Sequence, residues 1–261
     1  MKRKFQNITN WIAPGAAVLL LLCFWQGMCM AGILPGYMLP SPVQVVTAFR
    51  EDVPLLLQHS AATLQEAFLG LGIGIVGGFI LAFVMEQCSL LYQALYPVLV
   101  ITQTIPTVAI APLLVLWLGY GIAPKVTLVV IVTFFPIAVG LLDGFKEADP
   151  DAIRLMRAMG ASRLQIFRHI KLPSSISHFF AGLRISVSYA IVGAVISEWL
   201  GGFSGLGVYM TRVKKSYSYD KMFAVIFLIT ALSLILMKLV SVLQQRLTPW
   251  NQKALQEERS K

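Results

Sequence analysis

The sequence predicts an all-α integral membrane protein with about six transmembrane helices. Of its 261 residues, 57% are apolar and only 13% are charged, which excludes an ordinary soluble domain. The apolar residues form long runs, and a membrane-spanning helix needs about 20 of them. We expect one transmembrane domain over residues 11–243, with spans at about 11–34, 61–85, 96–118, 126–142, 176–197 and 222–243. Residues 1–10 and 244–261 are the expected polar ends.

The first apolar run follows three bases, Lys2, Arg3 and Lys4, as the apolar part of a signal peptide would. That part is usually about 7–15 residues long, whereas this run continues to Leu34 and Pro35. We therefore expect a retained first span whose basic start stays in the cytosol.

Basic residues set the expected orientation. Six lie in the loop 146–173 between the fourth and fifth spans, the strongest signal for a cytosolic loop. With this loop inside, both termini of the multi-pass protein are expected in the cytosol. The bases between Arg212 and Lys221 then fall outside, against the rule. They fit either a solvated charged face or a short helix that meets an acidic binding protein.

The spans differ in polarity. The second is rich in glycine, which favours close helix packing, and Glu66 lies near its outer end. A short outer loop with Lys125 is expected before the fourth span. Polar residues in the third and fifth spans are candidates for the substrate route, although intramembrane polar groups also serve as interhelical contacts. The candidates are Gln103, Thr104, Pro106, Ser186 and Tyr189.

The third span carries three prolines, Pro97, Pro106 and Pro112, which we expect to interrupt it. A broken helix is stable in a membrane only where protein or a water-filled cavity satisfies the freed backbone groups.

Residues 149–173 predict two short helices. Asp149 and Pro150 suit the start of the first helix, and Gly160 can take the left-handed conformation that ends it. Ser162 and Gln165 have the spacing of a capping box, so a second helix should begin there and stop before Pro173. The loop is expected to be helix, glycine turn, helix.

These two short helices carry apolar and basic residues at helical spacing and therefore need a partner surface. One candidate is the anionic headgroup layer of the membrane. The other is a cytosolic protein.

The second candidate is favoured by a resemblance. Gly160 and the later Ile170, Leu172 and Pro173 resemble the end of the coupling loop in permease subunits of bacterial ABC importers. Membership of that family implies the type I importer permease fold and a loop that docks on the ATPase. The residues implied in docking are Asp151, Arg154, Leu155, Met156, Met159, Gly160, Ala161, Arg163, Leu164, Phe167 and Pro173. The sequence departs from the family at 154–156, where Arg-Leu-Met replaces the frequent Glu-Ala-Ala.

The same resemblance implies the partners and the cofactors. Two cytosolic ABC ATPases would bind ATP and Mg²⁺, a second permease copy would complete the pathway, and a substrate-binding protein would deliver the solute from outside. No cofactor or metal is expected on this chain.

Two further stretches narrow the family. LPSP at 39–42 resembles the nitrate, sulfonate, taurine and thiamine-pyrimidine branch, and GAVISEWLGGFSGLG at 193–207 is similar to permeases for thiamine-pyrimidine precursors and riboflavin. A thiamine-precursor pyrimidine is the first expected substrate, with sulfonates, taurine, nitrate and riboflavin as alternatives.

Several other chemistries are disfavoured. The sequence has no G-x-x-x-x-G-K-[ST] phosphate loop, zinc-ligand cluster or nucleophile motif, so an enzyme is not expected. The net charge of +9 comes from short loops without an aromatic-basic platform, which argues against nucleic acid. The contrasting classes are an ATPase-independent secondary transporter, which normally needs ionisable residues at mid-membrane, and a lipid-bound membrane anchor.

Overall fold

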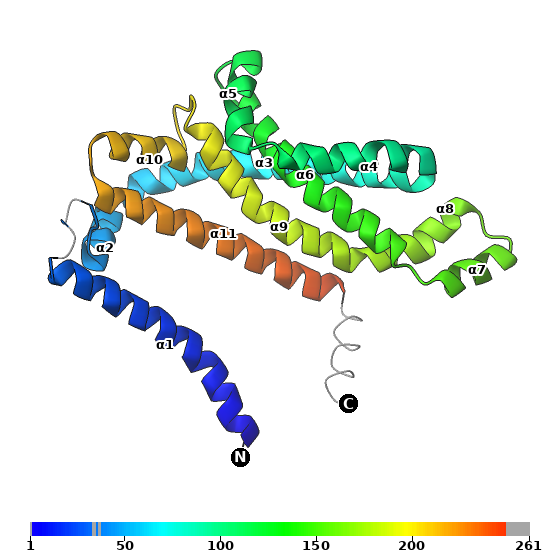
Figure 1. Ribbon diagram of the computed structural model, residues 1–261, viewed down its shortest axis with the longest axis horizontal. Coiled ribbons are helices and arrows are strands. Elements are labelled where there is room, and N and C mark those ends of the chain that lie inside the picture. Colours follow the sequence, from blue (N-terminus) through cyan, green and yellow to red (C-terminus); the bar gives the residue numbers. More distant parts are fainter. Residues whose placement is uncertain (1, 33–34, 36–37, 249–261) are drawn as a thin grey trace. The chain divides into compact units, whose positions relative to one another are not determined.

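The computed structural model describes residues 2–32, 35 and 38–248, and side chains from Gly15 onward. Almost all of these residues are helical, and none of them lies in a strand (Figure 1). Within this part of the chain, four helices are long and apolar enough to cross a membrane, and a sharply bent helix pair is a fifth candidate. The expected all-α membrane fold is thereby confirmed.

The first predicted span, 11–34, lies partly outside the described residues. Helix α1 (Lys2–Met30) covers most of it, and its described apolar part, Gly15–Met30, is shorter than a usual span.

The described chain forms two compact units. The first comprises the described residues up to Gln58 together with Tyr209–Leu228. It holds α1, α2 (Pro42–Glu51), most of α10 (Leu206–Lys215) and the start of α11 (Tyr219–Leu247). The bases at the end of α10, Arg212, Lys214 and Lys215, are exposed, in the region where the sequence allows a short basic helix.

Asp52 joins two segments of this first unit through polar contacts with Tyr209 and Lys221. Its carboxylate accepts a hydrogen bond of 2.5 Å from the Tyr209 hydroxyl and forms an ion pair of 2.9 Å with Lys221. Burial opposes ionisation of Asp52, but the bonds from Tyr209 and Lys221 and the charge of Lys221 together lower its pKa. Burial and the bond to Asp52 raise the pKa of the Tyr209 hydroxyl.

The second unit comprises His59–Val208 and the described residues from Ile229. Its core lies between α3 (Val53–Gln87), α6 (Ile122–Lys146) and α9 (Leu172–Glu198). The backbones of α6 and α9 lie very close, since a Cβ added at Gly182 would be 2.3 Å from the Pro136 carbonyl oxygen. Glycine on these helices therefore serves packing, as expected for helices in lipid.

The third predicted span is two helices, α4 (Ser89–Thr104) and α5 (Thr107–Leu118), which meet at 98° (Figure 1). The break falls at Pro106, which has no N–H to continue the ladder. Pro97 and Pro112, by contrast, lie inside α4 and α5 and do not interrupt them. The expectation of three interruptions is wrong at those two residues, because a helix in lipid tolerates proline where neighbouring groups satisfy the freed carbonyls.

The loop 146–173 contains α7 (Pro150–Ala158) and α8 (Arg163–Ile166). The prediction that the second helix stops before Pro173 is wrong. A π-helical turn, η1 (Phe167–Lys171), joins α8 to α9 without a break. The Leu172 N–H bonds to the Phe167 carbonyl five residues back, and this wider turn makes room for the proline ring at the second residue of α9.

Candidate functional sites

The turn between α7 and α8 is built by local hydrogen bonds. Asp149 caps α7 by accepting from the Asp151 N–H at 2.9 Å. Ser162 and Gln165 form both bonds of the predicted capping box at the start of α8. Gly160 has φ of +83°, the left-handed conformation predicted for it. The caps and the glycine turn are thus confirmed, and they fix the geometry of the turn.

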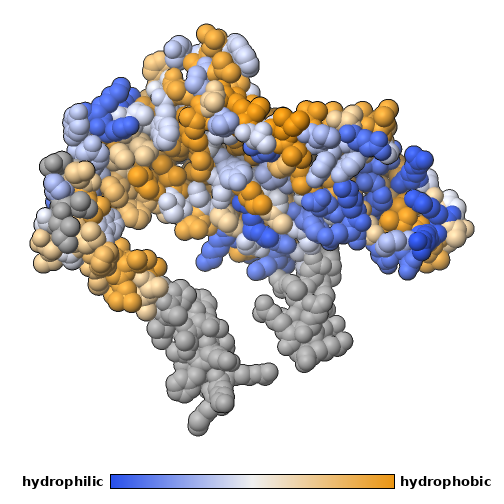
Figure 2. Space-filling model, in the orientation of Figure 1, coloured by the Kyte–Doolittle hydropathy of each residue, from blue (hydrophilic) through white to orange (hydrophobic). Residues whose placement is uncertain are grey.

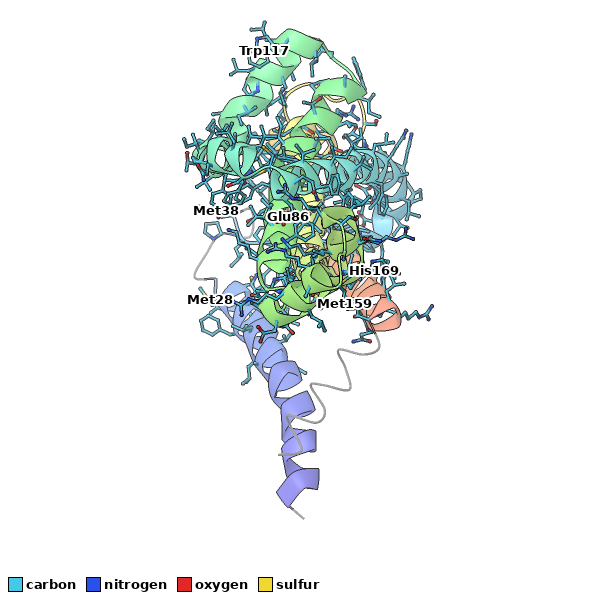
Figure 3. The ribbon with its side chains drawn as sticks, turned by 90° about the vertical axis from the view of Figure 1, so that its right-hand side faces the viewer. Met28, Met38, Glu86, Trp117, Met159 and His169 are labelled. Carbon is cyan, nitrogen blue, oxygen red and sulfur yellow. The ribbon has the colours of Figure 1, made fainter. Side chains whose placement is uncertain are left out.

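Three large apolar side chains stand out from this turn: Leu155 is 64% exposed, Met159 77% and Leu164 61%. Figure 2 shows the α7–α8 end, at the right, as a mainly hydrophilic surface that includes apolar side chains, and Figure 3 labels Met159 there. The other predicted docking residues divide by burial. Asp151, Arg154, Gly160, Arg163 and Pro173 are exposed, and Met156 and Ala161 are half-buried.

Phe167 is the exception among the predicted docking residues. Its ring lies in the core, 4.9 Å from the Phe83 ring and 5.2 Å from the Phe145 ring between centroids. Unlike Leu155, Met159 and Leu164, it does not project from the turn. An aromatic side chain buries a large apolar area, so the contacts of Phe167 with Phe83 and Phe145 anchor the turn to α3 and α6.

A second candidate site lies at the break between α4 and α5. A cavity of about 310 Å³ is bounded by Gln103, Thr104 and Pro106 on one side and by Tyr189 of α9 on the other. The remaining lining residues are Ile105, Thr107, Val132, Val192, Gly193 and Ile196. Four of the five predicted route residues therefore meet at one cavity. None of its lining residues is Asp, Glu, His, Lys or Arg.

Ser186, the fifth predicted route residue, does not reach this cavity. It is fully buried and donates a hydrogen bond of 2.7 Å to the Thr133 carbonyl on α6. This hydrogen bond joins α9 to α6, as intramembrane hydroxyls commonly do between helices.

A buried ion pair was not predicted from the sequence. Lys125 lies in the first turn of α6 rather than in an outer loop, and its Nζ is 2.5 Å from Glu66 Oε1 on α3. Lys125 also donates to the Ser204 carbonyl at 3.5 Å. Neither charge touches solvent appreciably, so each is stabilised mainly by the other.

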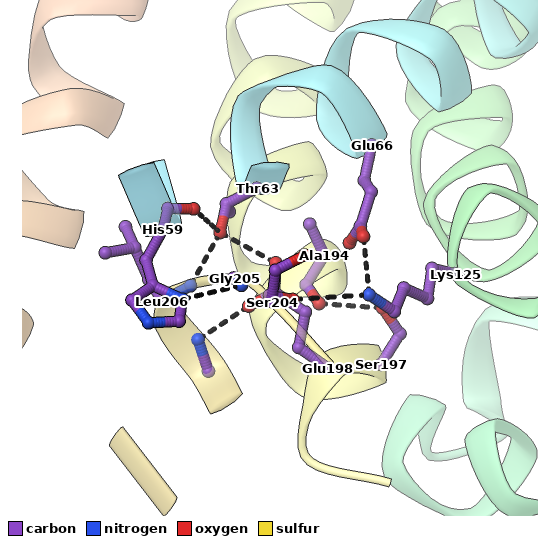
Figure 4. A network of polar contacts seen from close by, with 11 residues as sticks. His59, Thr63, Glu66, Lys125, Ala194, Ser197, Glu198, Ser204, Gly205 and Leu206 are labelled. Atoms are coloured by element: carbon purple, nitrogen blue, oxygen red, sulfur yellow. Dashed lines mark hydrogen bonds and ion pairs between the residues drawn. The ribbon is translucent and has the colours of Figure 1, made fainter. Parts of the chain in front are cut away.

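The loop after α9 is held by a neighbouring set of bonds (Figure 4). Glu198 accepts from the Thr63 hydroxyl at 2.7 Å and from the Gly207 N–H at 2.6 Å. The Leu206 N–H donates to Thr63, and the Gly205 N–H donates to His59 Nδ1 at 2.9 Å. These contacts tie the end of the loop 199–205 and the first residues of α10 to α3 and to the end of α9.

Gly205, in the 193–207 stretch, is required by this close approach. A Cβ added at Gly205 would lie 2.1 Å from the Glu198 carboxyl carbon, and Gly205 has φ of +123°. The signal that could have found the network is a pair of acids, Glu66 and Glu198, at the ends of otherwise apolar runs. Across the described ranges, no three His, Cys, Asp or Glu side chains gather as metal ligands.

Comparison with known proteins shows which proteins this chain is similar to. Residues 74–250 match the family model described as "Binding-protein-dependent transport system inner membrane component". The chain is 37% identical to the formylaminopyrimidine transport permease protein ThiX of Halalkalibacterium halodurans, over 97% of this chain and all of that protein. It is 33% identical to the riboflavin transport system permease protein RibX of Chloroflexus aurantiacus, over 92% of this chain and 91% of that one.

A solved structure shares the fold. The superposition on a chain of an amino acid ABC transporter, crystallised with histidines, has a TM-score of 0.62 and covers 77% of this chain and 97% of that chain. The two sequences are only 19% identical, so this likeness concerns the fold alone.

Proposed function

The chain belongs to the family of binding-protein-dependent transport system inner membrane components, and on this premise we propose that it forms the translocation pathway for a thiamine-precursor pyrimidine. It is an ABC importer permease. In the proposed assembly, two cytosolic ABC ATPases bind the α7–α8 turns of two permease copies. A substrate-binding protein delivers the solute. ATP and Mg²⁺ bind to the ATPases, and this chain has no catalytic role of its own.

One structural observation supports this mechanism above the others. The helical path Arg163–Glu198 is continuous from the α7–α8 turn to the far end of α9. Tyr189 of the same path borders the cavity at the α4–α5 break. A displacement of the turn can therefore reach the cavity along one continuous helical path. Such coupling between two sites requires an element with two arrangements that both sites bias, and α9 is our candidate.

The cavity supports the substrate class. Its lining offers an amide, hydroxyls and apolar surface but no charge. An anion such as a sulfonate or nitrate would lose its hydration there without a compensating charge, which is strongly unfavourable. A neutral heteroaromatic solute can instead stack on the Tyr189 ring and exchange hydrogen bonds with the Gln103 amide. Relatives whose names state a substrate include a formylaminopyrimidine permease and a riboflavin permease.

We assign the protein to the bacterial plasma membrane, with both termini and the α7–α8 turn in the cytosol. The support is the family's inner-membrane location and the excess of bases in the loop 146–173. The buried network of Glu66 and Glu198 then lies at the outer end of the helices. The alternative of an anchor whose loop only rests on lipid gives no role to the cavity.

Uptake by reconstituted vesicles tests the proposal. Vesicles containing the permease, its ATPase and its binding protein should accumulate labelled formylaminopyrimidine only when ATP is supplied. Excess unlabelled sulfonate or nitrate should not compete. Uptake that persists without the ATPase would identify a secondary transporter instead, and competition by sulfonate but not by pyrimidine would reassign the substrate.

A further inference from the structure

A second cavity, of about 190 Å³, lies between the end of α3 and the α7–α8 turn. Two arginines line it from opposite sides of the turn: Arg157 near the end of α7 and Arg163 at the first residue of α8. Lys171 of the π-helical turn lines it too and forms an ion pair with Glu86, the residue labelled in Figure 3. We call this recess, with Gln87, Ile166 and Phe167 completing its lining, the arginine cavity.

The charges of the arginine cavity do not balance within the chain. Its one acid, Glu86, is already paired with Lys171. Among residues 2–32, 35 and 38–248, neither Arg157 nor Arg163 has a carboxylate within ion-pair distance. Two guanidinium groups facing one recess repel each other, and an anion placed between them would remove that repulsion.

The shape of the cavity suits a carboxylate. A guanidinium presents a planar fork of N–H donors that binds a carboxylate through two parallel hydrogen bonds. The volume is several times the roughly 30 Å³ that a water molecule occupies in the liquid, which is enough for a short acidic side chain. Arg157 lies in the last turn of α7 and Arg163 is the first residue of α8, on either side of Gly160, so the two helices already position their backbones.

We propose that the arginine cavity receives an Asp or Glu side chain of the partner ATPase. This rests on the proposed function, and it specifies the charge of the contact: the permease supplies the bases and the ATPase supplies the acid. The exposed Leu155, Met159 and Leu164 lie on the same turn and provide apolar contact around the ion pair. An anchoring arginine surrounded by apolar contacts that exclude water is the usual anatomy of a strong interface site.

Charge reversal of the cavity is the first test. The permease–ATPase complex is purified in detergent with the double variant Arg157→Glu/Arg163→Glu and with the matched control Arg168→Glu. Arg168 is exposed on the π-helical turn and does not line the cavity. We expect the amount of ATPase that co-purifies with the double variant to fall by about tenfold or more relative to the unaltered chain, and the amount that co-purifies with the control to stay unchanged. A glutamate at the first residue of α8 suits the positive end of that helix, so melting of α8 would not explain the loss.

A carbodiimide cross-link is the second test. In Arg163→Lys the positive charge is kept and an amine is supplied, so a carboxylate in the cavity should be joined to it as an amide. Mass spectrometry should then find a peptide of residue 163 linked to an Asp or Glu of the ATPase. The Arg168→Lys control should give no such link.

Two results would overturn the proposal. One is a double variant that retains the ATPase as well as the unaltered chain does, at low and high salt. The other is a double variant that loses only its preference for vesicles with anionic lipid, which would assign the cavity to a lipid phosphate. An unaltered chain that never co-purifies with an ATPase would instead refute the proposed function itself.

Discussion

The buried pair Glu66–Lys125 allows a quantitative prediction about stability. The two residues are only 5% and 6% exposed, and their charged atoms are 2.5 Å apart. Replacing Lys125 with Met keeps most of the side-chain volume but leaves the Glu66 carboxylate buried without its cation. The second oxygen of Glu66, Oε2, is buried and has no hydrogen-bond partner, and Lys125 is the only cation that forms an ion pair with Glu66 among the described residues. Removing one member of a buried pair costs about 3–5 kcal/mol.

The double variant Glu66→Leu/Lys125→Met separates the cost of an unpaired charge from the cost of losing the pair. Since apolar replacement of a whole buried pair is often neutral or stabilising, we expect the double variant to recover most of the roughly 3–5 kcal/mol lost by Lys125→Met. The free energy of unfolding in detergent, measured by denaturant titration, is the readout.

A matched surface pair provides the control. Asp151 and Arg154 are 84% and 78% exposed in their side chains, and Arg154→Met should change the free energy of unfolding by less than about 1 kcal/mol. If Lys125→Met were as mild as Arg154→Met, the Glu66–Lys125 pair would not be buried as described, and the reasoning would be refuted.

Three further predictions concern other residues. Gly205→Ala should destabilise the protein by about 2 kcal/mol or more, because of its positive φ and the approach of Glu198, whereas Gly72→Ala, with nothing within 4 Å, should not; thermal unfolding distinguishes them. The pKa of Asp52 is lowered in the folded protein, so its carboxylate stabilises the fold above its unfolded pKa, and this stability is lost as the pH falls through the folded pKa. Asp52→Asn should therefore lower the free energy of unfolding at neutral pH and weaken its decrease below about pH 4. An unchanged decrease at acid pH would contradict this. Gln103→Glu should lower pyrimidine uptake by about tenfold or more by placing a charge in the neutral cavity, and Gln93→Glu on the same helix should not.

The parts of the fold that depend on neighbouring residues were predictable from sequence. Asp149, Gly160 and the Ser162–Gln165 box obey local rules of helix capping, and each is used as expected. Apolar runs likewise indicate where long helices lie, because lipid admits little else.

The parts that depend on distant residues were not predictable. The local sequence predicts Lys125 in a loop, because nothing near it in the chain indicates its contact with the distant Glu66. The helical spacing places Phe167 on an exposed amphipathic turn, because that spacing carries no information about its contacts with Phe83 and Phe145. Pro173 reads as a helix end, since a proline alone does not indicate that a π-helical turn will accommodate it.

The position of the bonds at Glu198 has a consequence for how far the cavity can move. These bonds fix one end of the rod Arg163–Glu198, and the α7–α8 turn lies at the other. A rod held at one end sweeps least near its pivot. Because an α-helix rises evenly along its axis, Tyr189 travels only about a quarter as far as Arg163. A large displacement of the α7–α8 turn on the cytosolic side would thus move Tyr189, beside the solute, by a much smaller distance.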